Sequence, residues 1–225
     1  MSKFDINIKP FGFQAILIEW PARIDDQILD DIIQFTSTIV SNEKSDLINH
    51  TPGYNSLLLQ YQSEIDFKAK RTLILNLYNS PKKAQNRTSK DWHIPVCYDD
   101  KFGLDLPLFA DNGLTRNEVI KLHTSTSFRI FMIGFLPGFL YLGGLPKELI
   151  MNRKDTPRSY VPKGSVAIGG EQTGIYPMAS PGGWQIIGRT PLTLFDLNKD
   201  DPTPIRQGDK IQFYSIGLET YQNLS

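Results

Sequence analysis

Residues 155–196 read DTPRSYVPKGSVAIGGEQTGIYPMASPGGWQIIGRTPLTLFD, so that short apolar runs alternate with glycine and proline. Glycine and proline interrupt helices and mark turns, and many short strands between such turns are typical of a β-barrel or β-sandwich. This composition extends outward from the stretch, because of the 17 glycines in the chain only Gly12 and Gly53 precede residue 91. The strands expected in this region span 93–98, 127–135, 159–162, 166–168, 184–187, 192–197 and 211–216.

One helix is expected within this β-rich region. Thr115 and Glu118 stand three residues apart ahead of an apolar stripe, which is the form of a capping box. The helix is expected to end beside His123, where the helix dipole would stabilise a cationic imidazole able to donate to a carboxylate. The ordinary interpretation of such a histidine is a C-terminal cap.

The first 79 residues alternate between strand and helix signals. The β-rich run AILIEW at 15–20 favours a strand, and Asp25 or Asp26 then offers an N-cap to an amphipathic helix. A turn signal between 46–51 and 54–61 predicts a hairpin. This part of the chain is therefore expected to form a small α/β sandwich, in which helices cover one face of a sheet.

A second helix and a linker follow the hairpin. Ser63 and Asp66 have the spacing of a capping box, and Ser80-Pro81 is expected to end the helix that they begin. The segment 81–91 is polar and basic, as solvated linkers are. We therefore expect an α+β protein with an N-terminal α/β sandwich domain at 1–80, a linker at 81–91 and a β-barrel domain at 92–225.

Composition excludes several classes of function. The 24 Lys and Arg residues balance the 24 Asp and Glu residues, so the chain has no basic excess with which to neutralise nucleic-acid phosphates. The single cysteine, Cys97, cannot form an internal disulfide, which suits a reducing compartment. No secretory signal is expected, because the first residues, MSKFDINIKPFGF, contain an acidic residue and proline where such a signal has a basic end and an apolar run. No membrane helix is expected, because glycines and Pro137 interrupt the uncharged stretch 130–146. We expect a cytoplasmic protein.

Several catalytic patterns are missing from the sequence. No G-x-x-x-x-G-K-[ST] motif occurs, so the chain alone is expected to bind no ATP. The three histidines, His50, His93 and His123, lack the short spacings of a zinc site, so no metal is expected.

The loops of 135–189 are the strongest candidates for a binding site. Glycines in rigid turns allow close backbone approach, so amide N–H groups could line an anion pocket in which Arg153, Arg158 or Arg189 binds a carboxylate. The same loops would otherwise form barrel corners with solvated arginines, or an interface with another protein chain.

Three stretches resemble one known family. GFLPGFLYLGGLP at 134–146, the stretch 155–196 and WHIPVCYDDKFGLDL at 92–106 are similar to the family of 5-oxoprolinase B subunits. That family is also known as allophanate hydrolase subunit 1 and as a kinase-A inhibitor (Kip) family. The resemblance implies a cyclophilin-like fold for the β-barrel domain, although a shared fold does not confer prolyl isomerase activity.

The resemblance also implies a function and its partners. With the A and C subunits of 5-oxoprolinase, such a chain would open 5-oxo-L-proline to L-glutamate, with the substrate at a shared site. ATP would be used by the complex and not bound by this chain alone, and the isolated chain would be inactive. Two other functions remain open: an inhibitor that docks on a sensor histidine kinase, and a component of allophanate or urea breakdown.

Candidate site residues follow from the motifs that match the family. His123 would move a proton or stabilise charge, and Arg158 would bind the carboxylate or the phosphorylated oxygen, both as catalytic residues. The expected substrate-binding residues are Pro137, Gly138, Phe139, Gly164, Ser165, Gly182, Gly183 and Arg189.

Overall fold

The computed structural model of the chain describes residues 4–80 and 88–225. It contains two compact units, Met1–Thr88 and Ser89–Ser225, each built around a hydrophobic core of its own. The predicted linker falls largely on 81–87, outside the described residues, and a strand already begins at Asp91. In the described part of the chain, no helix is long and apolar enough to cross a membrane.

The N-terminal unit is an antiparallel sheet with helices packed on it. Its elements are β1 (Asn7–Pro10), β2 (Ala15–Glu19), α1 (Asp26–Asn42), β3 (Leu47–Pro52), β4 (Ser56–Tyr61) and α2 (Phe67–Asn79). The strands run in the order β1-β2-β4-β3, and α1 packs against β3, β4 and α2. The expected α/β sandwich is therefore confirmed, with Asp25 as the N-cap of α1.

The start of α2 corrects one prediction. The Asp66 carboxylate accepts a hydrogen bond from the Ala69 N–H at 3.1 Å, so Asp66 is the N-cap, and the capping box predicted at Ser63 is wrong. The physical reason lies one residue upstream, because the Ile65 N–H donates to the Phe13 carbonyl at 3.0 Å. This bond holds the chain against the sheet until the helix begins.

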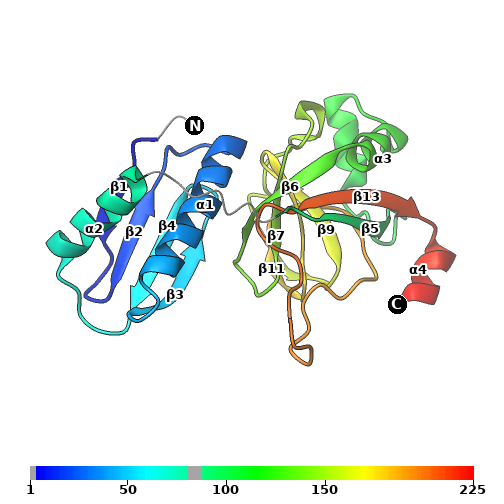
Figure 1. The fold of residues 1–225 in the computed structure, drawn as a ribbon. Helices are drawn as coiled ribbons and strands as arrows, with labels where there is room; N and C mark the ends of the chain where they lie inside the picture. The colour runs from blue at the N-terminus through cyan, green and yellow to red at the C-terminus, as the bar shows by residue number, and fades with distance from the viewer. Residues whose placement is uncertain (1–3, 81–87) are drawn as a thin grey trace. The chain divides into compact units, whose positions relative to one another are not determined.

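The C-terminal unit is a closed β-barrel with short additions (Figure 1). The barrel strands run in the order β10-β7-β6-β13-β5-β12-β9, while β8 and β11 pair separately. Strand β13 is parallel to β5, and α3 packs against β13. The elements are β5 (Asp91–Cys97), η1 (Leu106–Asn112), α3 (Arg116–Ser125), β6 (Ser127–Ile133), β7 (Leu140–Gly143), η2 (Lys147–Leu149), β8 (Arg158–Val161), β9 (Ser165–Gly169), β10 (Gln172–Ile175), β11 (Ser180–Gly182), β12 (Gln185–Arg189), β13 (Lys210–Ile216) and α4 (Leu218–Leu224).

Most of the predicted barrel strands are found, with one exception. Residues 192–197 form no strand, because Leu192 and Leu197 are exposed and the Asp196 N–H donates to the Pro202 carbonyl, which closes a loop. Strands β7, β10 and β11 are short, and the sequence pattern does not predict them. The capping box of α3 is confirmed, since Thr115 and Glu118 bond reciprocally.

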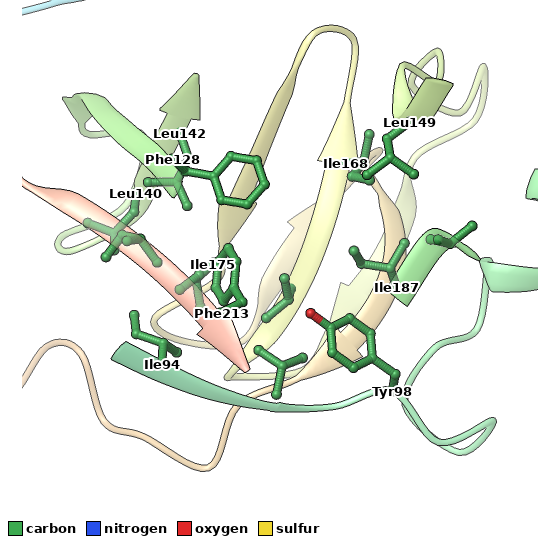
Figure 2. Close-up of a cluster of buried hydrophobic side chains, with 14 of the residues drawn as sticks. Ile94, Tyr98, Phe128, Leu140, Leu142, Leu149, Ile168, Ile175, Ile187 and Phe213 are labelled. Atoms are coloured by element: carbon green, nitrogen blue, oxygen red, sulfur yellow. The ribbon is translucent and has the colours of Figure 1, made fainter. Parts of the chain in front are cut away.

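The barrel interior is filled by apolar side chains (Figure 2). The core residues labelled there are Ile94, Tyr98, Phe128, Leu140, Leu142, Leu149, Ile168, Ile175, Ile187 and Phe213. Each such side chain contributes about 1.5–3 kcal/mol when fully buried. The barrel is therefore a packed scaffold, and ligand sites have to be sought in the loops around it.

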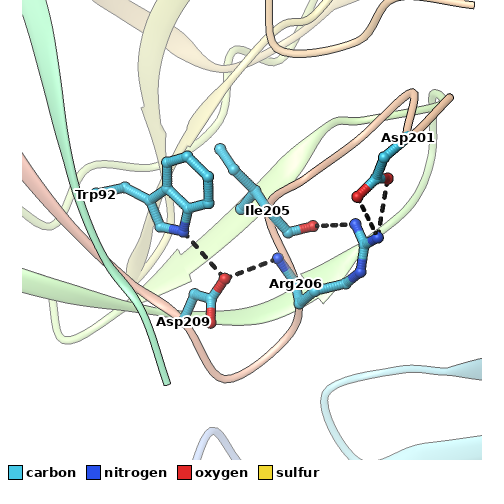
Figure 3. A network of polar contacts seen from close by, with 5 residues as sticks. All are labelled: Trp92, Asp201, Ile205, Arg206 and Asp209. Atoms are coloured by element: carbon cyan, nitrogen blue, oxygen red, sulfur yellow. Dashed lines mark hydrogen bonds and ion pairs between the residues drawn. The ribbon is translucent and has the colours of Figure 1, made fainter. Parts of the chain in front are cut away.

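A buried carboxylate fixes the start of β13 (Figure 3). Asp209 accepts hydrogen bonds from the Trp92 indole N–H and from the backbone N–H groups of Arg206 and Lys90, each at 3.0 Å. The Arg206 guanidinium pairs with exposed Asp201 on the outer side. Asp209 thus joins the loop before β13 to β5, where the parallel strands meet.

Candidate functional site

Four aromatic side chains gather on the outside of the barrel, and we call Phe139, Tyr141, Tyr176 and Trp184 the aromatic cluster. The Phe139 ring makes edge-on contacts with Tyr176 and Trp184, at centroid distances of 5.0 and 5.5 Å, and lies 4.7 Å from Tyr141. Such aromatic pairs stabilise a fixed arrangement beyond the area they bury. The cluster is a rigid apolar surface.

Glycines in the surrounding strands make room for these rings. A Cβ at Gly169 would lie 2.6 Å from the Trp184 ring, and one at Gly174 would lie 2.9 Å from the same ring. A Cβ at Gly182 would collide with the Tyr176 hydroxyl. These three glycines therefore admit aromatic side chains.

A cavity of about 340 Å³ opens beside the cluster, and we call it the aromatic pocket. The aromatic cluster lines it together with Phe135, Gly182 and Gly183, and with two cationic residues, Arg153 and Lys154. Its size lies at the small end of the range for small-molecule sites, and its composition, apolar walls with a few polar groups, is typical of them.

Two kinds of polar group face the apolar walls. The Arg153 guanidinium lies 5.4 Å from the centre of the Trp184 ring, a cation–π distance. Burial raises the pKa of the Tyr141 and Tyr176 hydroxyls, although the nearby Arg153 charge opposes this. The pocket therefore offers a fixed positive charge and protonated hydroxyls, which suit an anionic ligand with a further acceptor oxygen.

Phe135 lies at the pocket under backbone strain. Its φ of 68° is in the left-handed region that a bulky residue rarely adopts, and its side chain is 62% exposed. The ring lies 5.7 Å from Phe139 in an edge-on contact. Strained conformations of this kind concentrate at binding sites.

A second cavity shares Arg153 and Lys154 with the aromatic pocket, and we call it the polar cavity. Its volume is about 820 Å³. Its polar lining residues include Asp111, Asn112, Asn152, Asp155, Thr156 and Gln185.

The segment shared by the two cavities is fixed by two hydrogen bonds. The Gln185 side-chain Nε2 donates to the Asn152 carbonyl at 2.9 Å, and the Lys154 N–H donates to the Gly183 carbonyl at 2.7 Å. Arg153 stands between these two attachments. We call residues 152–154 the ridge.

Arg158 forms an ion pair with Asp105 beside the ridge. Its Nη2 donates to Oδ1 of buried Asp105 at 2.8 Å, and the Lys154 Nζ lies 3.6 Å from the same oxygen. The other carboxylate oxygen accepts from the Ile186 N–H at 2.6 Å. The buried Arg158 Nη1 has no hydrogen-bond partner among the described residues. Asp105 therefore holds Arg158, the ridge and β12 together.

His123 lies inside the barrel, and its environment corrects an expectation. The imidazole is fully buried, with Nδ1 2.7 Å from the Tyr98 hydroxyl and Nε2 3.0 Å from Thr173 Oγ1. Burial lowers the pKa of His123 to about 3, so the ring is neutral, and the cation expected at the helix end is wrong. The loss of hydration outweighs the helix dipole here.

The structure brings only some of the predicted site residues together. Phe139, Gly182 and Gly183 line the aromatic pocket. Pro137 and Gly138 form the turn before Phe139, where Gly138 has a φ of 81°.

Three other predicted residues already have partners inside the fold. The Gly164 N–H donates to the Tyr176 carbonyl, and the Ser165 N–H donates to the Pro162 carbonyl. The Arg189 Nε donates to the Lys163 carbonyl at 2.7 Å. We expected the Gly164 and Ser165 amides to be free to bind a ligand, but both already donate to carbonyl groups of the protein. The substrate-binding roles of Gly164, Ser165 and Arg189 remain predictions.

Sequence reasoning missed several residues of the site. Tyr176, Lys154 and Gln185 carry no local motif, since each acquires its place through contacts distant in sequence. Tyr141, in contrast, belongs to the motif around Phe139, because it stands two residues after Phe139 and neighbours of this spacing share one face of a strand. Across the described residues, no group of three or more His, Cys, Asp or Glu side chains could hold a metal ion.

Comparisons with known proteins extend over nearly the whole chain. Residues 6–205 match the family model of the carboxyltransferase domain, subdomain C and D. The 5-oxoprolinase B subunit of Bacillus subtilis (strain 168) is 35% identical, over 96% of this chain and 95% of that protein. The 5-oxoprolinase B subunit of Haemophilus influenzae is 37% identical, over 95% of this chain and 100% of that protein.

The fold itself is shared more widely. The crystal structure of the Kluyveromyces lactis urea carboxylase matches with a TM-score of 0.81 at 23% identity, over 97% of this chain and 22% of that one. At that identity the likeness shows the fold alone. The family model and the full-length similarity to two 5-oxoprolinase B subunits show that the chain belongs to the family of these subunits, within the carboxyltransferase domain family.

Proposed function

We propose that this chain is the B subunit of an ATP-dependent 5-oxoprolinase, which opens 5-oxo-L-proline to L-glutamate together with the A and C subunits. The aromatic pocket with its two cations is the observation that carries the proposal. In this proposal the complex works in the cytoplasm, ATP is bound by the complex rather than by this chain alone, and the isolated chain is inactive.

The substrate and the pocket have matching chemistry. 5-Oxo-L-proline is a five-membered lactam that carries a carboxylate, so it has one apolar edge and one anionic group. Trp184 and Phe139 would cover the methylene edge, while Arg153 and Lys154 would receive the carboxylate. The pocket volume of about 340 Å³ accommodates a molecule of this size.

The reaction breaks the amide bond of the ring. Water supplies its oxygen to the carbonyl carbon, which becomes a carboxylate, and both its hydrogens to the nitrogen, which becomes an ammonium group. Because opening this lactam is uphill, ATP would first transfer its terminal phosphoryl group to the carbonyl oxygen, which releases ADP. After the C–N bond has broken, a second water molecule would release that group as phosphate and leave the carboxylate. The hydroxyls of Tyr141 and Tyr176, which burial keeps protonated, would donate to the carbonyl oxygen.

The family motifs suggest Arg158 and His123 as catalytic residues, but neither of them lines the aromatic pocket. Arg158 would act as a positioning residue, since Asp105 connects it to Lys154 and so to the ridge. His123 would support the barrel wall from inside, because its side chain is fully buried.

The test uses the assembled complex. The chain is purified with the A and C subunits, and L-glutamate formation from 5-oxo-L-proline is measured with and without ATP. Arg153→Ala is expected to raise KM at least tenfold, because the carboxylate loses its charge partner. Arg71→Ala is the matched control, since Arg71 is exposed on α2 of the other unit. Unchanged kinetics in Arg153→Ala would remove this residue from the site, and absence of turnover in the complex would overturn the function.

The two other functions remain alternatives with their own readouts. A kinase inhibitor would lower the autophosphorylation of a sensor histidine kinase and would give no lactam turnover with the A and C subunits. A component of allophanate or urea breakdown would be required for turnover of one of those substrates and not of 5-oxo-L-proline. The likeness to urea carboxylase in fold does not by itself favour this alternative.

A further inference from the structure

The polar cavity contains charges of both signs. Asp111 and Asp155 supply carboxylates, and Arg153 and Lys154 supply cations from the ridge. A ligand with only one kind of charge would meet groups of its own sign in such a cavity. A zwitterion, in contrast, can place each charged group against an opposite one.

Gln185 adds a polar group without a partner. The residue is 6% exposed, and its Nε2 donates to the Asn152 carbonyl, which fixes the orientation of the side-chain amide. The buried Oε1 therefore points away from that bond as an acceptor, and it has no hydrogen-bond partner among the described residues. Buried acceptors in native proteins are nearly always paired, so a donor from a ligand at this wall of the cavity would satisfy the oxygen.

Ring opening produces the kind of molecule that such a cavity fits. When the amide C–N bond breaks, the nitrogen changes from a neutral N–H into an ammonium group with three donors. The carbonyl carbon becomes a second carboxylate. The product is more strongly hydrated than the lactam, so it fits the aromatic pocket less well than the substrate does.

We propose that the polar cavity is a product site that binds an α-amino acid zwitterion with a carboxylate side chain, namely L-glutamate. The α-ammonium group lies between Gln185 Oε1 and the Asp155 carboxylate, and one carboxylate stays on the ridge cations. Because Arg153 and Lys154 line both cavities, the product keeps this anchor while its new charges leave the aromatic pocket. The identity of the amino acid rests on the proposed function.

The test measures binding without turnover. Backbone amide NMR spectra of the full chain are recorded during titration with L-glutamate, with 5-oxo-L-proline and with glutarate, which lacks the ammonium group. L-Glutamate is expected to shift the amides of residues 111–112 and 152–156, with glutarate at least tenfold weaker. 5-Oxo-L-proline is expected to shift the residues of the aromatic pocket instead.

Two variants test the named groups. Gln185→Leu is expected to weaken L-glutamate binding at least tenfold, and it also removes one of the two hydrogen bonds that fix the ridge. Asp155→Asn, at an exposed position that leaves both of those bonds in place, is expected to weaken L-glutamate binding about fivefold and to leave 5-oxo-L-proline binding within twofold. Asp91→Asn, exposed at the start of β5, is the matched control and should change neither affinity.

The outcomes separate this proposal from the function on which it rests. If L-glutamate shifts no resonance of the polar cavity, or if glutarate binds equally well, the product site is wrong even when the complex turns over 5-oxo-L-proline. If L-glutamate binds as expected while the complex shows no turnover, the amino-acid site stands and the proposed function fails.

Discussion

The Tyr98 hydroxyl donates a hydrogen bond to Nδ1 of His123 at 2.7 Å inside the barrel. The direction of this hydrogen bond follows from the bond that the second ring nitrogen, Nε2, makes. Thr173 Oγ1 donates to the Ala167 carbonyl at 3.0 Å, so it accepts from Nε2 of His123, and Nδ1 is left as the acceptor. Burial raises the pKa of Tyr98, which keeps its hydroxyl protonated. One hydrogen-bonded chain thus crosses the apolar core.

Replacing His123 by alanine is expected to destabilise the protein by about 2–4 kcal/mol, because the change leaves a cavity and an unpaired buried hydroxyl on Tyr98. The ring also stacks on Phe213 at 4.5 Å, and this contact is lost. Urea unfolding followed by circular dichroism measures the change.

The control is His93→Ala, at an exposed position of β5, which should unfold at the wild-type urea concentration. Equal midpoints for His123→Ala and the wild type would contradict the structural role. Wild-type stability together with lost turnover in the complex would restore the catalytic role that the family motifs suggest for His123.

Stability is expected to fall as pH drops below about 6.5. His123 has a pKa of about 3 when folded, against 6.5 for the free side chain, so between these values only the unfolded chain binds the proton. The contribution is complete above pH 6.5 and is lost toward pH 3, with a slope of up to about 1.4 kcal/mol per pH unit. Urea unfolding at several pH values measures it.

His123→Gln separates this effect from other titrating groups, because glutamine keeps a donor and an acceptor and does not titrate. The difference in unfolding free energy between wild type and variant should shrink as pH falls from about 7 to about 5. A difference that stays constant over this range would show that His123 does not titrate as expected.

The barrel could be predicted from sequence where a strand coincides with a short, mainly apolar run of residues. Runs such as 93–98 and 211–216 carry that signal, and both are strands in the structure. The run 192–197 carries it as well, but there the chain closes a loop through the Asp196 and Pro202 backbones. Strand formation depends on a pairing partner, and the pattern of one segment does not contain it.

The residues of the candidate site likewise fall into two groups, those that local sequence predicts and those placed by contacts distant in sequence. Phe139 and the Gly182-Gly183 pair belong to local motifs and were found, whereas Gln185 depends on contacts with a segment more than 30 residues away. The burial of His123 was missed for the same reason, since Tyr98, Thr173 and Phe213 reach it from three different strands or strand ends. Local sequence shows that a histidine lies near the end of a helix, but not what packs around it.

Replacing Gly169 by alanine is expected to disturb the aromatic pocket. The new Cβ would lie 2.6 Å from the Trp184 ring, so the ring has to move, at a cost of about 1–3 kcal/mol. Near-ultraviolet circular dichroism should change, and 5-oxo-L-proline binding should weaken. Gly217→Ala is the control, because a Cβ there meets nothing within 4 Å. An unchanged spectrum in Gly169→Ala would mean that this glycine does not set the position of the ring.

Replacing Asp105 by asparagine is expected to cost about 1–3 kcal/mol, because partly buried Arg158 loses its ion-pair partner while the Ile186 N–H keeps an acceptor. Arg158→Met in the same chain should recover part of this loss, since the partly buried guanidinium that lost its carboxylate is then absent as well. Urea unfolding of both single variants and the double variant gives the coupling energy. Additive losses would show that the pair contributes nothing jointly, and Asp105 would then hold the ridge through Lys154 and β12 alone.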